Sequence, residues 1–416
     1  MNSHSIRKGV KTVLYREMGK TGDQVSILGY GCMRFPRADR RIDEKRTEAQ
    51  IITAIEQGVN YFDTAYVYPG SEVTLGKILS KGYRDKVLIA TKMPLFMIHS
   101  AKDMEATLDT QLKRLQTDHI DYYLMHSINS MAGWQRIKEL GVEEFLLKAK
   151  EAGKINRIGF SYHGEKHQFK NIVDDYPWEF CQIQYNYMDE QNQAGKEGLS
   201  YAASKGLGIS IMEPLRGGLL ARKMPEEVQK VLEEHGKERT PAEWALRWVW
   251  NHPEVSLLLS GMNEESQIEE NIRIADSCYP GSMTEEELET IQQAKEILTK
   301  KVQVKCTGCG YCLPCPAGVN IPVCFGYYND KYIYNDSSAR TFYMGMLSGA
   351  DGGKPSYASL CLNCGKCEKH CPQHLPIRRH LKDVSKEMEK LYFKPAVGLL
   401  RGYYYLRGGL GKKSNK

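Results

Sequence analysis

The sequence lacks any long hydrophobic run. No stretch of about 18 apolar residues, the length that spans a bilayer as a helix, occurs in it. The first eight residues, Met1 to Lys8, also lack the apolar core of a secretory signal peptide. The sequence therefore predicts a cytoplasmic protein with no transmembrane segment.

A large excess of charge of one sign is also missing. The 57 lysines and arginines are nearly balanced by 51 acidic residues, which leaves a formal net charge of +6 spread along the chain. This pattern predicts no nucleic-acid partner. The 416 residues are too many for one ordinary core and indicate two domains.

Disulfide bonds are not expected, although the chain has 12 cysteines. Eight of them form two short clusters late in a large chain, whereas disulfide frameworks are typical of small secreted domains. Metal binding is therefore the expected use of these eight. The others are predicted to be buried structural thiols, and they are Cys32, Cys181, Cys278 and Cys324. Of these, Cys32 alone could face a substrate, because it ends the first predicted strand.

Eight predicted strands alternate with helices over the first two thirds of the chain. The strands are expected at 25–33, 59–65, 87–93, 120–127, 155–161, 180–185, 208–212 and 255–260. Helical patterns occur between them at 44–57, 103–116, 142–152, 193–205, 241–250 and 264–274. This alternation predicts an α/β fold, the (β/α)8 TIM barrel, whose active residues lie at the C-terminal ends of the strands.

Three consecutive predicted strands end in ionisable side chains. They deliver Asp63, Lys92 and His126, and Tyr68 follows Asp63 on a loop. A tyrosine that acts as a general acid near neutral pH needs a pKa below its usual value of about 10, and a lysine ammonium about 4 Å away can supply that. The alternative is a buried ion pair beside a tyrosine and a histidine with no catalytic role.

These four residues, in their local settings, resemble the catalytic tetrad of the aldo-keto reductases, over roughly residues 12 to 280. The resemblance implies that Tyr68 protonates a carbonyl oxygen while NAD(P)H delivers hydride to the carbon. Asp63 would hold Lys92, and His126 would orient the substrate. It also implies that Ser161 and Gln184 hydrogen-bond the nicotinamide carboxamide and that the turn of Pro214, Leu215 and Gly217 passes the pyrophosphate.

The chain departs from the family pattern at several cofactor positions. Tyr162 stands where an asparagine is usual, and Met212 stands where an aromatic residue often stacks on nicotinamide. The adenosine-phosphate segment keeps its closing pair, Glu270 and Asn271. Two positions that commonly carry Lys and Arg in NADPH-using members hold uncharged residues, Gly261 and Gln267. Since phosphate recognition depends on charge-assisted hydrogen bonds, we expect NADH to be favoured over NADPH.

Two cysteine motifs lie beyond the barrel, each with three cysteines at two-residue spacing followed by Cys-Pro. They resemble the bacterial two-cluster ferredoxins. The resemblance implies one [4Fe-4S] cluster on Cys306, Cys309, Cys312 and Cys371, and another on Cys315, Cys361, Cys364 and Cys367. Zinc is the alternative, but it favours two separated Cys-x-x-Cys pairs and does not explain the third cysteine or the prolines.

These features predict four segments. They are a barrel at 12–285, a linker helix at 286–303, a ferredoxin-like domain at 304–395 and a basic aromatic tail at 396–416. About 45 residues separate the two cysteine motifs, and their aromatic side chains are expected to pack in a core. The tail is expected to dock on its own protein, with a membrane surface or a partner as the alternative.

The leading hypothesis is a reductase of a small-molecule carbonyl with two attached [4Fe-4S] clusters. Nicotinamide moves two electrons and each cluster moves one, and the sequence shows no flavin site that would convert between them, so an unrecognised flavin or an electron-transfer partner protein stays possible. One alternative is a nicotinamide-binding electron-transfer or redox-sensing protein with little turnover. Another is a cluster-driven reductase that uses no nicotinamide.

Overall fold

A computed structural model describes residues 13–39, 41–164, 166–335, 337–349 and 354–400 of the chain. By its packing the chain divides into two compact units. The first combines Met1–Arg222 with Arg239–Leu288, and the second combines Lys223–Glu238 with Glu289–Lys416.

The first unit is a closed barrel of eight parallel strands, which confirms the predicted fold. In barrel order the strands are β3 (Leu28–Gly31), β6 (Tyr61–Asp63), β7 (Leu88–Pro94), β8 (Ile120–Ile128), β9 (Ile155–Tyr162), β10 (Phe180–Gln184), β11 (Gly208–Met212) and β12 (Leu257–Ser260). β12 pairs with β3 and closes the ring. Aromatic and aliphatic side chains such as Tyr61, Tyr122 and Phe180 form a fully buried cluster of this unit.

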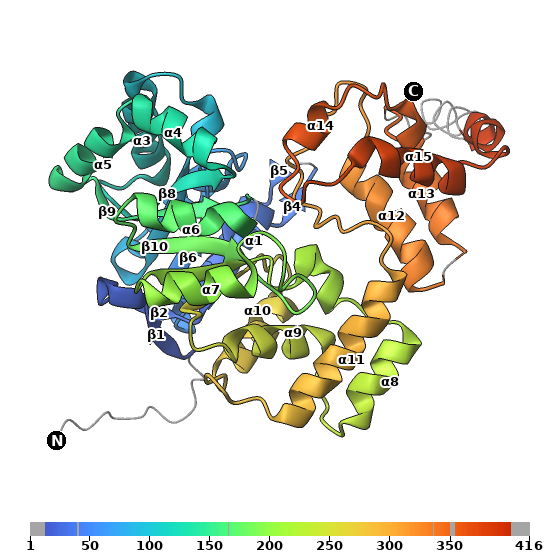
Figure 1. The fold of residues 1–416 in the computed structure, drawn as a ribbon, viewed down its shortest axis with the longest axis horizontal. Helices are drawn as coiled ribbons and strands as arrows, with labels where there is room; N and C mark the ends of the chain where they lie inside the picture. Colours follow the sequence, from blue (N-terminus) through green and yellow to red (C-terminus); the bar gives the residue numbers. More distant parts are fainter. Residues whose placement is uncertain (1–12, 40, 165, 336, 350–353, 401–416) are drawn as a thin grey trace, which may run out of the picture. The chain divides into compact units, whose positions relative to one another are not determined.

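Helices surround the barrel strands (Figure 1). They are α1 (Glu44–Glu56), α2 (Ser71–Leu79), α3 (Ala101–Leu115), α4 (Met131–Glu139), α5 (Val142–Glu151), α6 (Lys166–Asp175), α7 (Gly195–Ser204), α9 (Pro241–Trp250) and α10 (Glu265–Ala275). Local sequence explains several boundaries. Before α9, for example, the Thr240 hydroxyl accepts a hydrogen bond from the Glu243 amide and Pro241 occupies the first turn.

Two local predictions were wrong. The first predicted strand, 25–33, is divided between β2 (Gln24–Ser26), which pairs antiparallel with β1 (Tyr15–Glu17), and the barrel strand β3. The predicted helical patterns also omit α4, which begins after Ser130, whose side chain accepts from the Gly133 amide. A hydroxyl cap of this kind is a start signal that the glycine in the first turn obscures.

The second unit is helical in the described ranges. It contains α8 (Glu226–Glu234), most of α11 (Glu285–Lys301), α12 (Ile321–Ile333), α13 (Ala339–Leu347), α14 (Lys366–Lys369) and α15 (Ile377–Met388). Figure 1 draws α12, α13 and α15 in orange to red. Their shared core includes Phe325, Tyr328 and Tyr343, so part of the aromatic insertion packs as expected, whereas Phe342 is 59% exposed.

The segment Lys223–Glu238, which the sequence places inside the barrel domain, packs with the second unit. The four predicted segment limits stay predictions. Residues 401–416, which make up most of the predicted tail, lie outside the described residues. Within the described ranges, no helix combines the length and the apolar character needed to cross a membrane.

Candidate active site and cysteine sites

Three neighbouring strands bring the predicted catalytic residues to one end of the barrel. Asp63 is the last residue of β6, Lys92 lies near the end of β7, and His126 lies near the end of β8. The parallel register aligns Asp63 with Ala90, and His126 with Pro94. Tyr68 lies between β6 and α2. The expected convergence is therefore present.

Asp63 and Lys92 form a buried ion pair. The Lys92 Nζ atom lies 2.6 and 2.7 Å from the two carboxylate oxygens of Asp63 and donates to the Thr64 carbonyl at 2.7 Å. Only 2% and 6% of the lysine and aspartate side chains are exposed. Burial raises the pKa of the Asp63 carboxyl, and the Lys92 ammonium opposes that rise. The pair thus holds a cation at a fixed point of the site.

Tyr68 and His126 face this cation. The Lys92 Nζ atom lies 5.2 Å from the centroid of the Tyr68 ring. The His126 ring meets the Tyr68 ring edge-on, with 6.2 Å between centroids. Burial lowers the pKa of His126 well below its usual value, and the Lys92 charge and His163 lower it further. His126 is therefore a neutral imidazole that can hydrogen-bond a substrate oxygen.

A second buried carboxylate holds the loop that carries Tyr68. Glu72 accepts hydrogen bonds from Thr91 at 2.7 Å and from Arg114 at 3.0 Å. Arg114 also donates to the Tyr66 carbonyl at 3.1 Å and lies over the Tyr66 ring. Because Tyr66 is two residues from Tyr68, this network limits how far the tyrosine can move.

Gln182 is a site residue that the sequence prediction missed. Its Nε2 atom donates to the Asp63 carboxylate at 3.1 Å from inside the barrel. Gln184, which was predicted to bind the carboxamide, donates to Asp189 at 3.2 Å and accepts from Gln193 at 2.5 Å. The two glutamines share one face of β10, because side chains of a strand alternate, so the sequence pattern alone does not separate them.

The turn predicted to pass the pyrophosphate has an unusual backbone. Arg216 and Gly217 both have positive φ, at 49° and 67°. The Arg216 side chain is buried with Asp189, and its Nε atom lies 2.9 Å from the carboxylate. Arg34, which the prediction also missed, donates to the Gly217 carbonyl at 3.1 Å. Pro214 and Leu215 precede this anchored turn.

The other predicted cofactor residues surround the same end of the barrel. The Ser161 hydroxyl accepts from the Ser127 amide at 2.7 Å, within an irregularity of β8, and keeps a proton to donate. Met212, at the end of β11, is half-buried. A Cβ atom added to Gly261 would lie 3.6 Å from the Cβ and Cδ atoms of Arg34, so the aliphatic part of this side chain lies near Gly261.

The remaining three predicted residues belong to α10 and contact the protein itself. Gln267 closes the start of the helix by accepting from the Asn263 amide at 3.0 Å. Glu270 accepts from the Thr240 hydroxyl, and Asn271 donates to the Ser260 hydroxyl at 3.0 Å. These contacts fix the helix at the end of β12.

The structure brings the four predicted ligands of the first group together, and it brings Cys315 and Cys361 near Cys367 of the second group. Cys306, Cys309, Cys312 and the distant Cys371 line one cavity, together with Phe325 and other side chains. Burial raises the pKa of the Cys312 thiol to about 12, and the charges of these three other cysteines raise it as well. Four sulfur atoms around a closed cavity fit a [4Fe-4S] cluster.

The second group has the same character. Burial raises the pKa of the Cys367 thiol to about 11, and Glu368, Cys361 and Cys315 add to that rise. Cys315 follows the first motif in sequence, but in the structure it lies near Cys367 of the second motif, as the ferredoxin pattern requires. The four other cysteines, Cys32, Cys181, Cys278 and Cys324, are buried as predicted.

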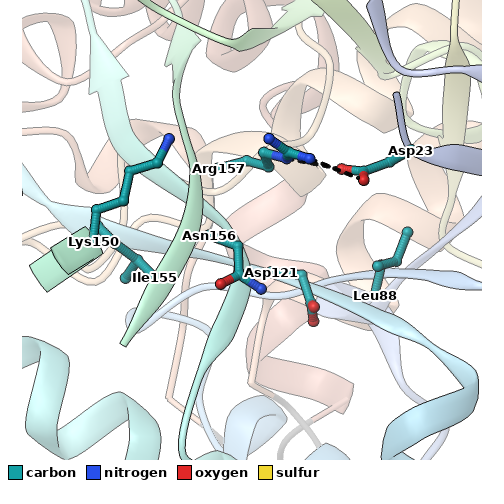
Figure 2. A pocket seen from close by; sticks show the side chains of 7 residues that line it. All are labelled: Asp23, Leu88, Asp121, Lys150, Ile155, Asn156 and Arg157. Carbon is teal, nitrogen blue, oxygen red and sulfur yellow. Dashed lines mark hydrogen bonds and ion pairs between the residues drawn. The ribbon is translucent and has the colours of Figure 1, made fainter. Parts of the chain in front are cut away.

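A polar pocket occupies the opposite end of the barrel (Figure 2). Its lining includes Leu88, Asp121 and Ile155, from the first two residues of β7, β8 and β9. Its charges are matched: Arg157 pairs with Asp23 at 3.0 Å, and Asp121 pairs with an arginine at 2.7 Å. Barrel enzymes place their chemistry at the C-terminal strand ends, so we assign this pocket to stability.

The comparisons with known proteins agree with the geometry of the barrel. The model of the aldo/keto reductase family matches residues 27–296. The chain belongs to the aldo/keto reductase family. A 4Fe-4S dicluster domain matches residues 305–375 of this reductase, so a ferredoxin-like domain follows the barrel.

Several relatives cover the barrel of this aldo/keto reductase. An uncharacterized oxidoreductase of Bacillus subtilis is 32% identical over 239 residues, which span 50% of this chain and 68% of that protein. L-Galactose dehydrogenase of Arabidopsis thaliana is 28% identical and covers 68% of this chain and 94% of its own length. The holo form of an aldo-keto reductase from Bacillus halodurans is 26% identical, with a TM-score of 0.57, over 68% of this chain and 96% of its own.

The depressed pKa of His126 predicts acid sensitivity of this reductase. The folded protein keeps His126 neutral, while the unfolded chain protonates it below about pH 6.5. Stability should therefore fall as the pH drops below that value, by about 1.4 kcal/mol per pH unit for one proton. In His126→Gln the free energy of unfolding should depend less steeply on pH, by up to about 1.4 kcal/mol per pH unit. Urea unfolding between about pH 5 and 7, followed by tryptophan fluorescence, measures it. If the free energy of unfolding had the same pH dependence in both proteins, the assignment of His126 as a neutral imidazole in the fold would be contradicted.

Proposed function

We propose that this protein reduces an aldehyde or ketone, with Tyr68 as the proton donor. The observation that carries the proposal is that the Tyr68 ring lies beside both the Lys92 ammonium and His126. A cation at this place favours loss of the phenolic proton, because it stabilises the phenolate relative to the phenol. A bound NAD(P)H would supply the hydride.

The residues divide the work between them. Asp63 and Gln182 fix Lys92 through the buried carboxylate. His126, neutral and buried, orients the carbonyl oxygen so that it lies within reach of the Tyr68 hydroxyl. The buried Glu72 and Arg114 network keeps Tyr68 at this place and limits the entry of water. Positioning of this kind converts a chance encounter into a favourable geometry.

The dinucleotide would lie along the turn at 214–217 and the segment that starts at Gly261. The Arg34 guanidinium donates to the Gly217 carbonyl and is suited to the pyrophosphate, and the aliphatic part of the same side chain lies near Gly261. The Ser161 hydroxyl keeps a proton for the carboxamide. Gln184 is already hydrogen-bonded on both sides of its amide, so Gln182 is the better candidate for a second contact near the nicotinamide.

We also propose a preference for NADH over NADPH. Arg46 of α1 reaches the start of α10, where a 2′-phosphate would need a cation, but it is already engaged. Its guanidinium lies 2.5 Å from Glu264 and 2.6 Å from Glu265. A phosphate at this place would meet the carboxylates of Glu264 and Glu265, and Arg46 would already be paired with both. This arrangement opposes phosphate binding.

We propose that the eight cysteines hold two [4Fe-4S] clusters, which supply single-electron transfer. A flavin or a protein partner would be needed if electrons pass between nicotinamide and the clusters, because the two differ in the number of electrons moved. The structure of the cysteine cavity supports the clusters, and nothing in the described residues requires the flavin.

An anaerobic titration of cluster-loaded protein with NADH, and then with NADPH, tests the proposal. We expect dinucleotide binding and carbonyl reduction, with tighter binding of NADH. Bleaching of the visible absorbance would mean that electrons reach the clusters and that a converter exists. Binding with no carbonyl turnover would instead favour redox sensing. The proposal would be contradicted if the protein bound neither dinucleotide and reduced no aldehyde or ketone of a broad panel.

A further inference from the structure

The two cysteine motifs of the second unit share the turn that follows their first cysteine. The Gly308 amide donates to the Cys306 sulfur at 3.4 Å, and the Asn363 amide donates to the Cys361 sulfur at the same distance. Both donors have positive φ, at 69° and 58°. Asparagine tolerates this conformation better than most side chains do. The side chains next to this shared turn can therefore be compared position by position.

The side chains of the second motif face solvent where those of the first do not. Thr307, which follows the first cysteine of its motif, is 3% exposed, whereas the corresponding Leu362 is 72% exposed. Cys309 is half-buried, whereas the corresponding Cys364 is exposed, unlike the other seven predicted ligands. A redox group held by the second motif is thus the more accessible one, and it lies beside an exposed apolar side chain.

Basic residues outnumber acidic ones in the sequence around this place. From Lys354 to Met388 the sequence has three acidic residues, and its lysines and arginines are Lys354, Lys366, Lys369, Arg378, Arg379, Lys382 and Lys386. Lys366 and Lys369 are exposed, and no ion pair to either occurs in the described part of the chain. Glu368, which lies between them in sequence, is 2.8 Å from Arg378 and so does not neutralise the lysines.

We propose that the surface of Leu362, Cys364, Lys366 and Lys369 is the docking site of a small acidic protein that carries single electrons. The proposal rests on the iron–sulfur clusters proposed above. An apolar centre with a rim of one charge is typical of transient electron-transfer interfaces, which are small and depend on complementary charge. Carboxylates of the carrier would face the two lysines.

The redox balance is one electron per encounter. The carrier loses one electron and this protein gains it, or the reverse, with no bond made or broken. The cluster that receives the electron is reduced and the carrier is oxidised, so the exchange is complete without nicotinamide at this surface.

The experiment uses the full chain and a plant-type [2Fe–2S] ferredoxin as the acidic probe. Iron and sulfide are first measured to establish cluster loading. Binding is then followed by calorimetry at low and high salt. We expect binding that weakens steeply with salt, and about a tenfold or greater loss of affinity in Lys366→Glu/Lys369→Glu. Leu362→Ser should weaken binding with little change in its salt dependence.

The matched control is Lys102→Glu/Lys113→Glu. It changes the formal charge by the same amount at two exposed lysines of α3, in the barrel unit and outside the proposed surface. This variant should bind within about twofold of the parent, because screening limits charge effects to about 10 Å at ordinary salt. Basic cytochrome c should not bind.

Each outcome decides between the hypotheses. Equal losses in the two charge variants would mean a general charge effect and would overturn the docking site. No binding by fully loaded protein would also overturn it, while leaving carbonyl reduction by the barrel untouched. Protein that never acquires iron and sulfide would overturn both this site and the proposed clusters.

Discussion

Tyr68→Phe should reduce the rate of carbonyl reduction by roughly 10²- to 10⁴-fold, the usual contribution of a general acid. The substitution removes the hydroxyl and keeps the ring beside Lys92 and His126, where the ring centroid lies 5.2 Å from the Lys92 Nζ atom. Packing and dinucleotide binding should therefore stay close to those of the parent. Steady-state turnover, together with NADH binding measured by fluorescence, separates the two effects.

Tyr83→Phe is the matched control for that substitution. Tyr83 is also half-buried and also has a lysine near its ring, with Lys86 Nζ 5.1 Å from the centroid. It lies before β7, away from the C-terminal strand ends, so turnover should be unchanged. Turnover of Tyr68→Phe equal to that of this control would rule out Tyr68 as the proton donor.

Lys92→Met should destabilise the barrel by about 3 to 5 kcal/mol, because it leaves the Asp63 carboxylate buried without its partner. Only 6% of the Asp63 side chain is exposed. Adding Asp63→Asn should recover most of the lost stability, since neither charge then remains, and Gln182 can still hydrogen-bond the amide. Carbonyl reduction should be lost in both variants.

Tryptophan fluorescence during urea unfolding measures this effect cleanly. All five tryptophans of the chain belong to the first unit, so they report on the barrel and not on the iron–sulfur unit. A single variant as stable as the parent would show that Asp63 is protonated in the fold. A double variant no more stable than the single would show that packing, and not charge, causes the loss.

The barrel and the convergence of the tetrad could be predicted because both follow from local patterns. Apolar runs that end in Asp63, Lys92 and His126 indicate strands, and parallel neighbours bring their ends together. Cysteine spacing is equally local, and the resemblance to two-cluster ferredoxins that it carries implied that the distant Cys371 would join the first group.

The missed residues depend on contacts between distant parts of the chain. Arg46 meets Glu264 across 218 residues of sequence, and Arg34 meets Gly217 across 183. No local pattern marks an arginine for such a partner. Gln182 was missed for a different reason, because a strand presents alternate residues on one face and the prediction chose the neighbouring Gln184 of that face.

The turn that repeats after the first cysteine of each motif has an evolutionary consequence. Gly308 and Asn363 donate the same amide-to-sulfur hydrogen bond in the two motifs. This bond therefore does not depend on whether Thr307 or Leu362 precedes the donor. Leu362 and Lys366 can therefore change without altering how the cysteines are held. A descendant of this protein could acquire a new redox partner by a few surface substitutions, while the first cysteine motif and the barrel chemistry remain as they were.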